Sequence, residues 1–149
     1  MDDLVQFLRD RLNEDASVAQ AAAAKEGGGT WEAGTDHNMP WVSGQPQAGE
    51  HVVPLLVEFG YGNPDDYERA AHIARHDPAR VLREVEAKRA AIDQCAYWNE
   101  RAAREAVEPP KYPQPGLDIG LLLDAMNPVL RALALSYADH PDYQDDWKP

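Results

Sequence analysis

Three Asx-Pro dipeptides constrain the fold of this chain more than any other feature of its sequence. Asn63-Pro64, Asp77-Pro78 and Asn127-Pro128 each place a side-chain acceptor directly before a proline. Asn or Asp at the N-cap accepts a hydrogen bond from a free amide of the first helical turn, and proline at the first helical position sacrifices no hydrogen bond. The dipeptides therefore predict helices that begin at residues 64, 78 and 128.

Apolar periodicity defines the remaining helices. Leu4, Leu8 and Leu12 begin a stripe at helical spacing, and the Gly27-Gly28-Gly29 run stops it, so residues 1–26 are expected to be helical. The other predicted helices cover residues 64–75, 78–107, 117–126 and 128–137, and they are followed by an acidic tail over 138–149. Apolar residues surround the whole circumference of the helix at 117–126, which predicts that it is buried.

Residues 30–62 have a different character. Strand-type residues alternate there with Gly, Pro, Asn and Asp turn signals. The segment around Trp31 is expected to pair with the segment around Trp41 as an antiparallel meander. The run HVVPLLVEFGY is the best strand, and Pro54 within it predicts an edge position, a bulge or a strand that starts after the proline.

These elements predict the fold class. We expect an α+β, mostly helical single domain over residues 1–149. In it, a short antiparallel sheet from residues 30–62 packs on the N-terminal helix and on the long central helix.

The charge of the chain is strongly negative and unevenly distributed. The net charge is −12, and residues 27–68 hold seven acids and no Lys or Arg. Because nucleic-acid binding depends on neutralising phosphates, direct DNA or RNA binding is disfavoured. A single cysteine, Cys95, fits a reducing compartment, and it lacks a local base that would make it a nucleophile. With no signal peptide and no uninterrupted apolar run of about 18 residues, the sequence predicts a cytoplasmic protein without a membrane span.

His72 and His76 are the candidate metal ligands, because four-residue spacing on a helix can direct two imidazoles to one ion. Asp77-Pro78 opposes this assignment, since proline ends the first helix near His76 and turns His76 away from His72. We therefore expect a structural corner. No recognised catalytic motif is present, so the sequence predicts no catalytic residue and no cofactor, and it favours a non-enzymatic protein.

Basic residues collect around the start of the long helix, with Arg75, Arg80 and Arg83 foremost. They form either a solvated face paired with nearby glutamates or a docking face for an acidic partner or a second copy. Tyr143 and Trp147 in the acidic tail look exposed, which makes them further candidates for partner binding.

Three blocks of the sequence carry a resemblance. MDDLVQFLRDRL, HIARHDPARVLREVEAKR and LALSYADHPDY resemble a family of small actinobacterial and actinophage proteins of unknown function. The resemblance implies such a source and a cytoplasmic protein, and it implies no activity.

The leading hypothesis for function is a non-enzymatic interaction or regulatory protein that acts through contacts with a protein partner or through self-association. One alternative is an acidic nucleic-acid mimic that binds a DNA- or RNA-binding protein through residues 27–68 and the tail. The other is a metal-binding module that uses His72 and His76.

Overall fold

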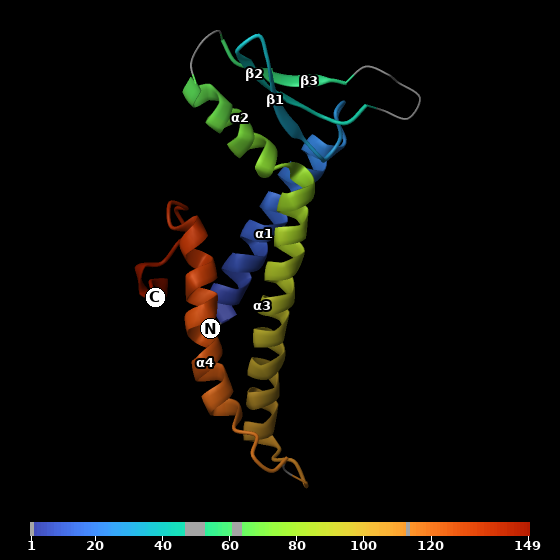
Figure 1. Ribbon diagram of the computed structural model, residues 1–149. Coiled ribbons are helices and arrows are strands. Elements are labelled where there is room, and N and C mark those ends of the chain that lie inside the picture. The colour runs from blue at the N-terminus through green and yellow to red at the C-terminus, as the bar shows by residue number, and fades with distance from the viewer. Residues whose placement is uncertain (1, 47–52, 61–63, 113) are drawn as a thin grey trace. The chain divides into compact units, whose positions relative to one another are not determined.

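The computed structural model describes residues 2–46, 53–60, 64–112 and 114–149 (Figure 1). Its elements confirm the predicted α+β, mostly helical class. They are α1 (Asp2–Ala23), β1 (Glu32–Asp36), β2 (Met39–Ser43), β3 (Leu55–Glu58), α2 (Pro64–Arg75), α3 (Pro78–Val107) and α4 (Ile119–Ala134), followed by short 3-10 turns at Leu135–Tyr137 and Asp145–Trp147.

The chain divides into two compact units. The helical unit comprises Met1–Asn13 and Glu86–Pro149, and the sheet unit comprises Glu14–Val85. The division falls within α1 and α3. That the chain folds as one domain stays a prediction.

The sheet unit contains the predicted meander. The strand order is β1-β2-β3 and both pairings are antiparallel. His37 and Asn38 form the tight turn between β1 and β2 with φ angles of 46° and 62°, a backbone whose twist matches that of the strands it joins. β3 starts after Pro54 and lies at the sheet edge, and the Pro54 carbonyl accepts from the Gly44 amide at 3.0 Å. The rest of the second predicted turn, residues 47–50, lies outside the described residues.

One face of the sheet is covered by α2 (Figure 1). Val42 of β2 and Ala70 of α2 are both fully buried in this contact, and Ala74 beside them is 9% exposed. The expectation that the N-terminal and long helices cover the sheet was therefore wrong about the principal covering helix. Small alanine side chains let α2 approach the strands closely, and a search for large apolar residues overlooks them.

The two helices predicted at 117–126 and 128–137 are one helix. α4 runs through Pro128, and its N-cap is Asp118, whose carboxylate accepts from the Leu121 amide at 3.0 Å. Asn127 therefore caps nothing. Proline removes one backbone hydrogen bond, and the helix continues because Leu130 and Ala134, beyond the proline, are fully buried.

The predicted burial of residues 117–126 was also wrong. Leu121 is 69% exposed, and Val129 further along α4 is 51% exposed. The buried residues of α4 are Leu130 and Ala134. Helix α4 thus combines a buried face with an apolar face that is open to solvent.

By length and composition, one segment of the described chain is long and apolar enough to cross a membrane. It is Ile119–Tyr137, of which 11% is buried. Asp124, Asn127 and Arg131 interrupt its apolar residues, so it contains no uninterrupted apolar run although its mean hydropathy is high.

Cys95 on α3 is buried, with 2% of its surface exposed. Burial raises the pKa of its thiol, so less thiolate is present at pH 8 than in an exposed cysteine. We expect an aromatic disulfide reagent to react with the native protein roughly 100-fold more slowly than with the denatured chain at that pH. A native rate within a few-fold of the denatured rate would show that Cys95 is accessible.

Candidate binding site

The sheet face opposite α2 carries a groove of about 440 Å³. Successive side chains of a strand point to opposite faces, so Val42 faces α2 while Trp41 and Ser43 face the groove. The described residues that line it are Glu32, Asp36, Met39, Trp41, Ser43, Val53, Leu55 and Glu58. We call this surface the open face.

Trp41 forms the floor of the open face. It pairs in register with Gly34 of β1 and with Glu58 of β3. A Cβ atom at Gly34 would lie 2.1 Å from the Trp41 ring, so only glycine lets the indole lie across β1. Sequence reasoning treated Trp41 as a strand residue and gave Gly34 no role, although a glycine inside a strand is a known sign of close approach.

Acidic side chains surround this apolar floor. They are Glu32 and Asp36 on β1 and Glu58 on β3. Asp36 is also 2.6 Å from Nδ1 of its neighbour His37. Because residues 27–68 contain no Lys or Arg, this part of the chain supplies no permanent cation to neutralise the rim. An apolar floor with an acidic rim is suited to a ligand that combines apolar and cationic groups.

The predicted corner between α2 and α3 is present. His76 lies just after α2, where its backbone amide and its Nδ1 atom both contact the His72 carbonyl, at 3.2 and 2.9 Å. The two imidazole rings lie 4.4 Å apart, so the expectation that His76 turns away from His72 was wrong. The rings are adjacent because His76 completes the last turn of α2. In the described chain, no group of three or more His, Cys, Asp or Glu side chains is placed to hold a metal ion.

Asp77 is the centre of this corner and is 8% exposed. One carboxylate oxygen accepts from the Arg80 amide at 2.6 Å, which is the predicted cap of α3. The other accepts from the Trp31 amide at 3.4 Å, just before β1. Asp77 therefore joins the start of α3 to the start of the sheet.

The basic candidates have separate surroundings. Arg80 pairs with Glu84 at 2.7 Å and donates to the Arg75 carbonyl, so it belongs to the corner. Arg75 and Arg83 are exposed and form no ion pair with a described residue. The paired face expected from the sequence is thus seen at Arg80, and partner binding by Arg75 and Arg83 stays a prediction.

Tyr143 and Trp147 are not the exposed side chains that the sequence suggested. Trp147 is 9% exposed, and its ring lies 4.8 Å from the ring of Phe7 on α1. Tyr143 is half-buried and meets Phe7 edge-on at 6.2 Å. The aromatic residues of the tail are therefore engaged within the helical unit.

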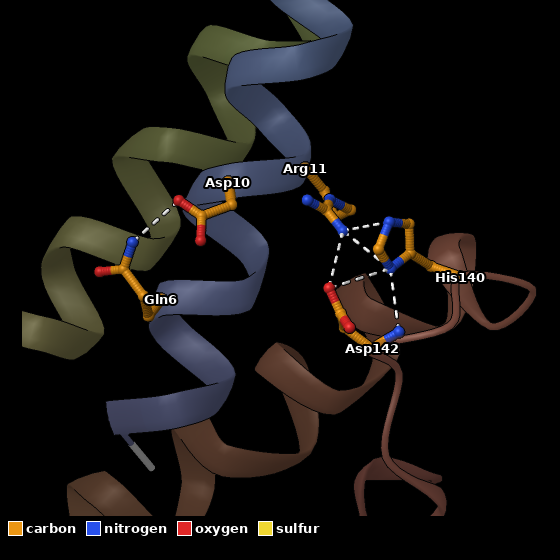
Figure 2. A network of polar contacts seen from close by, with 5 residues as sticks. All are labelled: Gln6, Asp10, Arg11, His140 and Asp142. Atoms are coloured by element: carbon orange, nitrogen blue, oxygen red, sulfur yellow. Dashed lines mark hydrogen bonds and ion pairs between the residues drawn. The ribbon is translucent and has the colours of Figure 1, made fainter.

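A polar network holds the same tail to α1 (Figure 2). Arg11 is 9% exposed, and its Nη1 atom lies 2.8 Å from Nδ1 of His140 and also contacts Nε2. The Asp142 amide donates to the same Nδ1 atom at 3.1 Å, and its carboxylate lies 3.9 Å from Arg11. Nδ1 acts as an acceptor in both contacts, which requires a lone pair on that nitrogen. The network anchors the tail to α1, and both ring nitrogens of His140 have a partner within it.

Three further side chains have pKa values that differ from their ordinary ones, each for a local structural reason. A hydrogen bond from Lys148 lowers the pKa of Asp145 and raises that of Lys148, at the exposed end of the tail. A hydrogen bond to Glu105 raises the pKa of Arg101 on α3. None of these residues lines the open face.

Together, the fold and the groove describe an α+β protein whose sheet exposes an acid-rimmed apolar surface. The chain belongs to a family of unknown function, DUF6221, which it matches over residues 1–149. No curated protein and no solved structure matches the chain.

Proposed function

We propose that the protein is a protein-binding module whose open face receives an extended, basic segment of a partner. The observation that carries this proposal is the pairing of an apolar floor, centred on Trp41, with the carboxylates of Glu32, Asp36 and Glu58. A cationic group above an indole gains attraction from the ring as well as from nearby carboxylates.

The size and edges of the sheet support an extended ligand. A volume of about 440 Å³ lies in the range of ordinary ligand sites and accommodates a few side chains. β1 and β3 each have one side with no partner strand among the described residues. Such an edge offers backbone donors and acceptors to an added strand, whose alternate side chains then fall on the open face.

The apolar floor favours this function over nucleic-acid mimicry. A mimic replaces a phosphate backbone with rows of carboxylates and gains little from a tryptophan and aliphatic floor between them. Metal binding at His72 and His76 receives less support, because the His76 Nδ1 atom lies on the His72 carbonyl.

The direct test uses a labelled peptide of about eight residues with alternating Arg and Val, read by fluorescence anisotropy. We expect binding with a dissociation constant on the order of 10 μM that weakens as salt is added. Trp41→Ala should weaken binding by about tenfold or more, because central aromatic residues dominate such contacts.

Two controls make this test specific. Tyr112→Ala changes an aromatic side chain that is 82% exposed and lies outside the open face, and it should leave binding unchanged. A peptide of the same pattern with Gln in place of Arg should bind poorly. Equal affinity for the two peptides, or unchanged affinity in Trp41→Ala, would refute the proposal.

A further inference from the structure

Helix α4 exposes an apolar stripe along one side. Leu121 and Val129 are 69% and 51% exposed, and Ala125 and Ala132 on the same side are exposed as well. Their spacing of three or four residues keeps them on one face of the helix, opposite the buried Leu130. Lone exposed apolar residues are ordinary, but a continuous stripe of them along a helix marks a contact surface.

Charge marks one edge of this stripe. Asp124 and Arg131 are seven residues apart, two helical turns, and therefore lie along the same edge. A two-fold axis between Pro128 and Val129 sets Ala125 against Ala132 of a second copy. An axis of this kind makes the two helices antiparallel. It places the charged edges of both helices on the same side of the dimer.

The two charges become complementary under that symmetry. Asp124 of one copy falls within about 3 Å, along the helix axis, of Arg131 of the other copy, and the pair occurs twice. The alanines allow the two backbones to approach, while Leu121 and Val129 fill the flanks. A surface that complements itself in shape and in charge is the requirement for an isologous dimer.

We propose that α4 is the contact surface between two copies of this chain, arranged antiparallel across Pro128. One helix from each copy gives an interface at the small end of those that form stable dimers, so self-association in the micromolar range is expected. This contact is independent of the open face.

Sedimentation velocity from about 1 to about 200 μM protein tests the proposal. The intact chain should shift from monomer to dimer across this range. Val129→Asp, at an exposed position beside the two-fold axis, should raise the dimer dissociation constant at least about tenfold. Val107→Asp is the matched control, because Val107 is 88% exposed on α3 and should leave the dimer unchanged.

A charge exchange tests the antiparallel register. Asp124→Arg and Arg131→Asp should each raise the dissociation constant roughly fivefold, because two attractive pairs become repulsive. The double variant restores attraction and should recover to within about twofold of the original value. Arg131 also donates to the Lys148 carbonyl at 3.2 Å, so the recovery in the double variant, rather than the single change, is decisive.

Several results would overturn the proposal. One is a chain that stays monomeric at every concentration. Another is an equal effect of the Val129 and Val107 variants on the dissociation constant. The third is a double variant whose dissociation constant does not recover. Cosedimentation of monomer with neutral phospholipid vesicles, lost in Val129→Asp, would assign the stripe to a lipid surface instead.

Discussion

Phe7→Ala is expected to lower the free energy of unfolding of the helical unit by about 3 to 5 kcal/mol. Phe7 is 7% exposed, and its ring meets those of Tyr137, His140, Tyr143 and Trp147. Removing it leaves a cavity beneath the tail and deprives Trp147 of its principal aromatic neighbour. Urea unfolding followed by circular dichroism measures the loss.

The consequence for the tail can be followed separately. In the folded state, the fluorescence of Trp147 should peak at a longer wavelength in Phe7→Ala than in the intact protein. A protease should also cleave residues 138–149 faster in the variant. Tyr112→Ala removes an aromatic ring that is 82% exposed and should cost less than about 0.5 kcal/mol. Equal stabilities of the two variants would contradict the packing of the tail on α1.

Asp77→Ala is expected to destabilise the sheet unit by about 2 kcal/mol, at the upper end for the loss of a helix cap. The Asp77 carboxylate is buried and accepts from two backbone amides, those of Arg80 and Trp31. Alanine leaves both amides without this acceptor in a site that water reaches poorly. Thermal unfolding and urea titration both measure the effect.

Two further variants distinguish the loss of the helix cap from a general loss of negative charge. Asp77→Asn keeps a side-chain oxygen that can accept from the Arg80 amide, so it should retain part of the stability lost in alanine. Asp139→Ala removes an exposed carboxylate and should be nearly neutral. A loss below about 0.5 kcal/mol for Asp77→Ala would contradict its role at the corner.

The sequence predicted the bounds of α2 and α3 to the residue because the proline of an Asx-Pro dipeptide acts locally. The cap itself is observed at Asp77, whereas the predicted cap Asn63 lies outside the described residues. The same reasoning failed at Asn127-Pro128. There, the buried side chains of Leu130 and Ala134, beyond the proline, favour a continuous helix, and their burial depends on tertiary contacts. Local signals therefore fix a helix end only where packing does not oppose them.

The candidate site was likewise predictable where it depends on local sequence and not where it depends on distant contacts. The Arg80–Glu84 pair follows from spacing within a helix and was predictable as part of a paired face. Two other features required knowledge of which distant segments meet. Trp41 lies over Gly34 because of strand register, and Trp147 lies against Phe7, 140 residues earlier in the chain. An acidic tail with aromatic residues therefore looked like an exposed binding segment, although its rings are packed within the protein.

The central claim is that the open face binds a basic, extended segment, and NMR shift mapping with the alternating Arg and Val peptide tests it most directly. The account predicts that backbone amides of β2 and β3, over Met39–Ser43 and Leu55–Glu58, shift progressively as peptide is added. Shifts confined to α3 and to the basic residues Arg75 and Arg83, or no shifts at peptide concentrations well above 10 μM, roughly the expected dissociation constant, would contradict it.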